Sequence, residues 1–115
     1  MKEKGIAAYC LMKKGAFEDF PFGVDVLVIK VASKIFALVS MRGSKLNLSL
    51  KCDPFLAEEL RQRHTAVTPG YHLNKKHWNT IIVDGSIPDQ EICWMIDHSY
   101  DIVFKSLTKA EKESL

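Results

Sequence analysis

The sequence has few cysteines and no long apolar run, and these two shortages exclude whole classes of protein. Its three cysteines, Cys10, Cys52 and Cys93, form no CxxC pair, whereas small secreted scaffolds carry dense, even sets. The longest apolar run near the N-terminus has seven residues, Ile6 to Met12, and no small-residue cleavage pattern follows it. No window approaches the roughly 20 apolar residues of a membrane span. We therefore expect a cytoplasmic protein that does not associate with membranes.

The common signatures of nucleotide, metal and protease chemistry are also absent. The sequence contains no GxGxxG, no GxxxxGK and no HExxH pattern. Its four histidines and three cysteines lack zinc-ligand spacing, and His72 with His77 across a turn is at best a weak pair. We expect no metal, no cofactor and no enzymatic activity.

Length and composition indicate one ordinary globular unit. The chain has 115 residues, which suits a single domain over residues 1–115. Hydrophobic residues make up 47% and charged residues 26%, as in globular proteins generally. A chain of this length buries enough surface to fold without disulfides or metal. We expect it to fold alone, as a monomer.

The net charge of +2 is too small to indicate a nucleic-acid partner, but the charges are unevenly distributed. The segment from Val26 to Cys52 carries five basic residues and no acid, and the segment from Leu60 to Val83 carries four more and no acid. Because these two segments hold +9, the remainder of the chain is strongly acidic. We expect a basic surface wherever the fold brings the two segments together.

Periodicity in the first half of the chain predicts one helix and three strands. Apolar residues at helical spacing predict a helix from Lys2 to Lys14, and the proline and glycine of Phe17 to Gly23 favour a structured loop. Alternating or β-branched runs then predict an antiparallel meander of three strands. These strands are Asp25–Val31, Lys34–Ser40 and Lys45–Lys51.

The second half predicts a helix, a hairpin and two further helices. Asp53 before Pro54 is an N-cap signal for a helix that reaches His64 or Thr65. The runs Tyr71–Leu73 and Trp78–Val83 favour a hairpin with Lys75 and Lys76 at its tip. Ser86 with Asp89, and Thr108 with Glu111, favour capping boxes at the starts of a long helix and a short terminal one. The expected buried stripe of the long helix is Ile92, Met95, Ile96, Ser99, Tyr100 and Val103.

The resulting order, α-β3-α-β2-α, predicts the α+β class. A mostly antiparallel five-stranded sheet with its helices on one face, a two-layer α/β sandwich, satisfies the alternating strands and one-sided helices. The opposite face of the sheet and the hairpin tips then stay open. Both basic segments consist mainly of strands and turns, so we expect positive charge to gather there.

One dense polar cluster suits nucleic-acid contacts. Lysines neutralise phosphates, and an exposed Trp or His can stack on an unpaired base. A solvated turn with Trp78 in the core explains the same composition, and composition alone favours that structural interpretation. The cluster consists of His72, Lys75, Lys76, His77, Trp78 and Asn79.

A second cluster, Asp97 to Asp101, has the residue types of a general base. His98 and Asp101 are three apart on a helix, but the adjacent Ser99 points elsewhere, so no catalytic triad forms. Asp97 and Asp101 would repel one another unless a cation or a donor lay between them. We therefore interpret Asp97, His98, Tyr100 and Asp101 as a structural clamp and expect Asp101→Ala to lower the melting temperature.

Several segments in this order and spacing resemble the MmcQ/YjbR-like family of small bacterial proteins. They are KCDPF from Lys51, PGYHLNKKHWNT from Pro69 and DHSYDIV from Asp97, with FEDFPFG from Phe17 in support. The resemblance implies an α-β3-α-β2-α domain similar to type III secretion chaperones, with two β-wings. It also implies DNA binding, by analogy of those wings with winged nucleic-acid binders.

Carried over to this sequence, the resemblance places Lys75, Lys76 and His77 on one wing, with His72, Trp78 and Asn79 beside it. Phosphate contacts are also expected from residues flanking the other hairpins, namely Lys30, Lys34, Arg42 and Lys45. The alternative is a protein-interaction module that holds a partner segment as secretion chaperones do. Iron handling of the frataxin type is disfavoured, because the first helix carries four lysines and only Glu3.

Overall fold

The computed structural model describes all 115 residues and contains four helices and six strands. In chain order they are α1 (Glu3–Leu11), β1 (Ala16–Asp19), β2 (Val26–Val31), β3 (Lys34–Arg42), β4 (Lys45–Lys51), α2 (Pro54–Arg63), β5 (Val67–Pro69), β6 (Trp78–Ile82), α3 (Asp89–Lys105) and α4 (Lys109–Glu113). No helix is long and apolar enough to cross a membrane.

All six strands form one antiparallel sheet in the order β1-β2-β3-β4-β6-β5. The α+β, two-layer prediction is confirmed, but the predicted number of five strands is wrong. The additional strand, β1, overlaps the start of the segment Phe17 to Gly23 that was expected to be a loop, with Ala16 opposite Val31 and Asp19 opposite Val28. It is a short, half-exposed edge strand with two acidic residues, so it lacks the alternation that reveals a strand in sequence.

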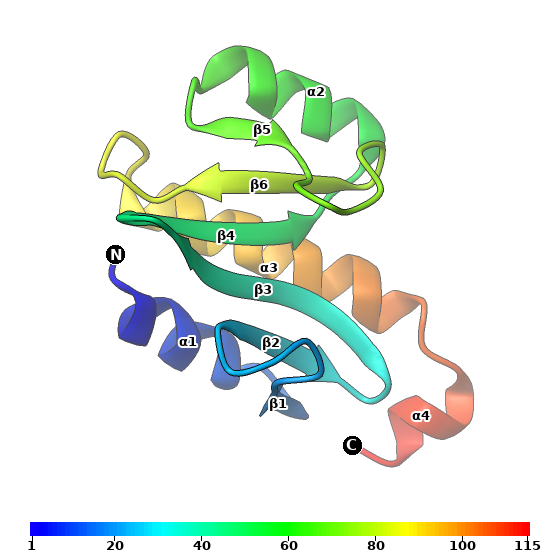
Figure 1. The fold of residues 1–115 in the computed structure, drawn as a ribbon. Helices are drawn as coiled ribbons and strands as arrows, with labels where there is room; N and C mark the ends of the chain where they lie inside the picture. Colours follow the sequence, from blue (N-terminus) through cyan, green and yellow to red (C-terminus); the bar gives the residue numbers. More distant parts are fainter.

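Two helices cover one face of the sheet and leave the other face open. Figure 1 shows α3 crossing behind β3 and β4, with α1 behind the β2 side. The predicted stripe of α3 is confirmed, because all six of its residues are buried. Helix α2 lies beside β5 and adds Ala57 and Leu60 to the same core. The open face is therefore flanked by loops rather than helices.

Two of the three predicted helix N-caps are present in the structure, and one is not. The Asp53 carboxylate accepts the backbone N–H groups of Phe55 (3.1 Å) and Leu56 (3.2 Å), and the Thr108 capping box is complete. The Ser86 cap is wrong, because α3 begins after Pro88 with no side-chain cap. The Ser86 N–H instead donates to the Asp84 carboxylate (2.9 Å) and closes a turn.

The second hairpin differs from the prediction in its first strand. Residues Tyr71–Leu73 are not a strand; β5 is Val67–Pro69, and its partner β6 begins at Trp78. Pro69 is tolerated because β5 is an edge strand. The two strands are joined by a loop of residues 70–77, which starts at a glycine packed on Trp78. A Cβ on Gly70 would lie 2.7 Å from the Trp78 Cβ, so only glycine fits there.

Candidate site on the open face of the sheet

Strand β4 separates apolar from polar side chains across the sheet. Leu46, Leu48 and Leu50 pack into the core beneath the helices, so Asn47 and Ser49 face the open side. Cross-strand pairing places Asn47 opposite Ser40 on β3, and Ser49 opposite Thr80 on β6. The middle of the open face is therefore polar.

Two loops border this polar strip. Residues 20–25 join β1 to β2, and residues 70–77 join β5 to β6; the first of these loops lies in front of the sheet in Figure 1. Between the loops is a depression of about 440 Å³. Its lining includes Phe22, Leu38, Arg42, Asn47, Tyr71 and Thr80.

Hydrogen bonds hold the 70–77 loop against the floor of the depression. The Ser49 and Thr80 hydroxyls bond to each other (2.8 Å), and Thr80 Oγ1 also accepts the Tyr71 N–H (2.9 Å). The Arg42 guanidinium lies 3.6 Å from the centre of the Tyr71 ring. The His72 ring packs against the Tyr71 ring, with 3.9 Å between the ring centres. The His72 backbone has a strained φ of 58°. These contacts bring the two acid-free basic segments together.

Asn47 has a largely buried side chain whose amide makes no hydrogen bond within the protein and reaches solvent in the depression. Only 4% of the residue is exposed, and its side chain makes no hydrogen bond to the protein. The Ser40 hydroxyl directly across the strand pair has no protein partner either. No fully buried side-chain N or O atom lacks a partner, so the amide and the half-buried hydroxyl both open into the depression, and they mark the point on the open face with unused hydrogen-bonding capacity.

Four of the predicted phosphate-binding residues border this face or the adjoining loop. Arg42 and Lys45 end the β3–β4 hairpin, are exposed and form no ion pair. Lys75 and Lys76 are exposed on the 70–77 loop, where the Lys75 ammonium donates to the Gly70 carbonyl (3.0 Å). The two loop lysines line a separate recess that also contains Asp53 and Glu58.

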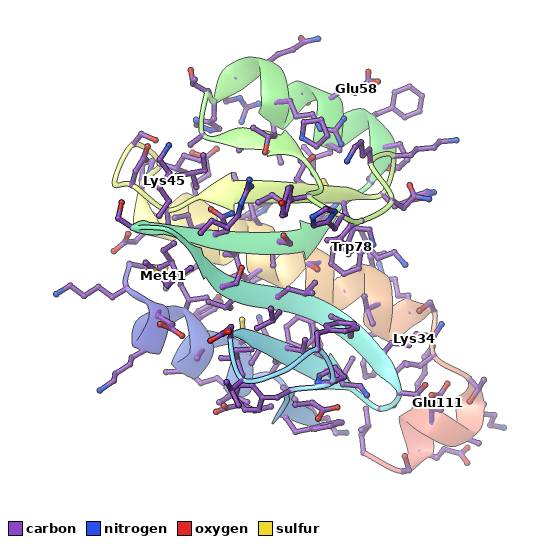
Figure 2. All side chains as sticks on the ribbon, in the orientation of Figure 1. Lys34, Met41, Lys45, Glu58, Trp78 and Glu111 are labelled. Carbon is purple, nitrogen blue, oxygen red and sulfur yellow. The ribbon has the colours of Figure 1, made fainter.

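The remaining predicted contacts lie elsewhere or are already engaged. The Lys34 ammonium binds the Ser106 hydroxyl (3.1 Å), and Figure 2 shows Lys34 and Lys45 at opposite ends of the sheet. Lys30 reaches the Asp19 carboxylate at 3.5 Å. The His77 carbonyl accepts the Cys52 N–H, and its half-buried ring lies at the base of the loop. These positions do not form one surface with the hairpin end.

Asn79 and Trp78 are anchored by an arginine that the sequence analysis did not single out. Asn79 is 3% exposed; its oxygen accepts Arg61 Nε (2.7 Å) and its amide donates to the Ala57 carbonyl (3.3 Å). The Arg61 guanidinium also donates to the Lys75 and Trp78 carbonyls. Arg61 thus fastens the 70–77 loop to α2, and Asn79 is not available to a nucleic acid. In the sequence, Arg61 is one of several charged residues on the predicted helix after Asp53, and nothing in that pattern indicates a contact with the loop.

The cluster at Asp97 connects α3 to α1. The Asp97 carboxylate accepts the Tyr9 hydroxyl (2.7 Å) and the Lys13 ammonium. The hydrogen bond to Asp97 is the main cause that raises the pKa of Tyr9 to about 12. The Tyr100 hydroxyl donates to the Lys14 carbonyl (2.7 Å). These contacts have the form of the clamp expected from the sequence.

His98 connects α3 to α2 in a different way. Its Nε2 accepts the Asp53 N–H at 3.3 Å, and its ring stacks on Trp94 at 5.5 Å. Burial lowers the pKa of His98 below its ordinary 6.5, which keeps the ring neutral and able to accept. Asp101 departs from the clamp, because it is exposed and its side chain contacts no donor. The expected effect of Asp101→Ala on melting therefore has no structural basis.

Ser99 is the clamp residue that sequence reasoning placed only in the buried stripe. Its hydroxyl donates to the Phe36 carbonyl (2.6 Å) and accepts the Lys51 N–H (2.9 Å). Ala37 pairs with Leu50, so Phe36 and Lys51 would be the next pair of the β3–β4 ladder. The Ser99 hydroxyl therefore bridges the Lys51 N–H and the Phe36 carbonyl, which do not bond to each other directly.

The remaining ionisable groups do not gather into a second site. No three His, Cys, Asp or Glu side chains lie close enough to hold a metal ion together. Burial raises the pKa of the Cys10 thiol to about 12 and that of Cys52 to about 11. The thiols are therefore protonated and packed in the core.

Comparisons with known proteins agree with the sequence and the fold. The YjbR family model matches residues 11–102. The Escherichia coli (strain K12) protein named Uncharacterized protein YjbR is 39% identical over 107 residues, which cover 93% of this chain and 91% of that protein. Uncharacterized protein YbdF of Escherichia coli O157:H7 is 34% identical over 95 residues, 82% of this chain and 77% of its own.

Solved structures show the same architecture. A crystal structure from Deinococcus radiodurans is 39% identical and superposes with a TM-score of 0.89, covering 96% of this chain and 85% of the other. A crystal structure from Pseudomonas syringae is 26% identical with a TM-score of 0.78, covering 89% of this chain and 98% of its own. The sequence match and the shared fold both extend over nearly the whole chain, which belongs to the YjbR family.

Proposed function

We propose that this protein binds DNA without catalysing a reaction, through phosphate contacts made by Arg42 and Lys45 on one hairpin and Lys75 and Lys76 on the 70–77 loop. The observation that carries the proposal is the Arg42–Tyr71 contact, which joins the two longest acid-free basic segments across the open sheet face. None of the four cations forms an ion pair within the protein, so each is free to neutralise a phosphate.

Binding of this kind carries little sequence information. Phosphate contacts set affinity and orientation, whereas base edges set specificity. The acidic neighbours Asp53 and Glu58 in the recess beside Lys75 and Lys76 weaken the local positive potential. We therefore expect modest affinity that depends strongly on salt.

Fluorescence anisotropy of a mixed-sequence duplex and of a single strand, over a range of salt, tests the proposal. Four neutralised phosphates give a slope of log affinity against log salt of about −3.6 for the duplex. The double variants Arg42→Ala/Lys45→Ala and Lys75→Ala/Lys76→Ala should each reduce that slope by about half. Lys2→Ala/Lys4→Ala on α1 removes the same charge from exposed positions and should leave the slope unchanged. A flat salt response, or equal losses in all three variants, would refute the proposal.

The second candidate is a protein-interaction module, favoured by two exposed aromatic residues on the helices. Phe55 on α2 is 87% exposed and Trp94 on α3 is 50% exposed. Type III secretion chaperones, whose fold the family resemblance implies for this chain, act as dimers. Sedimentation of the free protein separates the two functions, because a dimer with no salt-dependent DNA shift favours a protein partner, whereas a monomer that shifts on DNA favours nucleic acid.

A further inference from the structure

We infer that the depression on the open sheet face binds one unstacked nucleobase, with the phosphate of the same nucleotide held by Arg42. The inference deepens the proposed function and rests on it where the base belongs to a DNA strand; a free mononucleotide offers the same chemistry. Three features of the depression support this ligand class: its size, an amide on its floor that has no partner within the protein, and a cation on its rim that forms no ion pair.

The size and walls suit a flat aromatic group. The volume of about 440 Å³ lies within the range of small-molecule sites. Phe22 from one loop, Tyr71 from the other and Leu38 on the sheet supply apolar surface. Phe22 is 64% exposed, so its ring presents area that a stacked base would cover, whereas the Tyr71 ring is already contacted by Arg42 and His72 and supplies its edge.

The floor supplies a donor and an acceptor together. The Asn47 amide is 4% exposed and unpartnered, and the Ser40 hydroxyl lies opposite it. An Asn side chain matches the adjacent donor and acceptor on the edge of a base, as in its bidentate contact with adenine. An acyl chain would leave both groups buried and unpaired, so the floor disfavours a lipid.

The rim supplies the charge. The Arg42 guanidinium lies over the Tyr71 ring, 3.6 Å from its centre, and no carboxylate or carbonyl occupies its N–H donors. A guanidinium held in this way presents its edge, which matches the geometry of phosphate oxygens. The only carboxylate in the lining is Asp25, so the depression has no metal-ligand set.

The experiment records the NMR spectrum of the protein's amide groups while mononucleotides, DNA strands or inorganic phosphate are added in separate titrations. Titrations with the four deoxynucleoside 5′-monophosphates should shift the Asn47 side-chain NH₂ and the backbone signals of Tyr71 and Thr80. Inorganic phosphate alone should leave the Asn47 signal in place. Asn47→Leu should weaken nucleotide binding about tenfold or more, since it removes both hydrogen bonds to the base. Gln62→Leu, which removes an exposed amide on α2, is the matched control and should bind as the parent does.

Folding does not confound this test. Asn47→Leu removes an amide that makes no hydrogen bond within the protein, so no protein group loses a partner, and its melting temperature should equal or exceed that of the parent while its binding is lost. Equal nucleotide affinity in Asn47→Leu and the parent would overturn the inference, and so would an Asn47 shift caused by phosphate alone.

The failure of the inference is distinguishable from failure of the proposed function. Salt-dependent binding of the duplex and single strand that survives Asn47→Leu refutes the pocket and leaves DNA binding standing. Mononucleotide binding lost in Asn47→Leu, without any strand binding, supports the pocket with a free nucleotide as its ligand and refutes the DNA function.

Discussion

Removing the Ser99 hydroxyl should be among the most destabilising single-atom changes in this protein. Ser99 is fully buried, and its Oγ bridges the Phe36 carbonyl and the Lys51 N–H. A β-bulge between Ile29 and Lys30 shifts the β2–β3 register beside Phe36, which leaves that residue outside the regular pairing. Ser99→Ala therefore leaves a backbone acceptor and a backbone donor without the partner they share.

The size of the effect follows from those two groups. A buried donor or acceptor that loses its partner costs about 1–3 kcal/mol, so Ser99→Ala should lower the free energy of unfolding by about 3 kcal/mol. For a domain of this length, 1 kcal/mol lowers the melting temperature by about 4 °C, which gives a decrease of about 12 °C. Hydrogen exchange at the Lys51 amide should also accelerate more than at other amides of β4.

Calorimetry and urea unfolding of Ser99→Ala measure this effect directly. Ser44→Ala removes an exposed hydroxyl that bonds to nothing, and it should change stability by less than about 0.5 kcal/mol. If Ser99→Ala melted within about 2 °C of the parent, β3 and β4 would have closed to form the direct Lys51–Phe36 bond. The hydroxyl would then be dispensable and the reasoning refuted.

Three further predictions concern the contacts around α2 and α3. Burial lowers the pKa of His98 in the folded protein, so its contribution to stability is complete above pH 6.5 and is lost as the pH falls. The free energy of unfolding in urea should therefore differ less between pH 8 and pH 5 in His98→Gln than in the parent. Arg61→Met should lower the free energy of unfolding by about 2 kcal/mol, because the buried Asn79 oxygen loses its donor. Asp101→Ala should change stability by less than about 0.5 kcal/mol in thermal melts, since its carboxylate contacts nothing.

Each of these predictions has a control within the chain. Arg63→Met removes an arginine that pairs only with the surface carboxylates Glu59 and Glu91 and with nothing buried, so a loss equal to that of Arg61→Met would contradict the anchoring role. Asp97→Ala should melt below Asp101→Ala, because only Asp97 receives bonds from α1. An unchanged pH dependence in His98→Gln would show that the Asp53 N–H contact does not require a neutral ring.

Local signals predicted most of the elements, and the failures have physical reasons. The alternating leucines gave β4 its bounds, and Asp53 with Pro54 gave the start of α2, because both patterns act within a few residues. Strand β1 and strand β5 depend instead on pairing partners distant in sequence, and neither has an alternating pattern of its own. Ser86 had the residue spacing of a cap, but a competing turn with Asp84 took its backbone N–H.

The candidate site was less predictable because its parts come from four strands and two loops. The sequence indicated Arg42 as a cation and the 70–77 region as a polar loop, but only the strand register shows that Asn47 faces Ser40 on the open side. In sequence Asn47 is one polar residue of an alternating strand, where a solvent-exposed side chain is the ordinary expectation. Its burial results from the two loops that border the face, and neither loop follows from the strand pattern. The Asn47 amide makes no hydrogen bond within the protein and opens only into the depression, so a ligand bound there would supply the partners that the chain does not, and this gives the clearest reason to look for a ligand at that position.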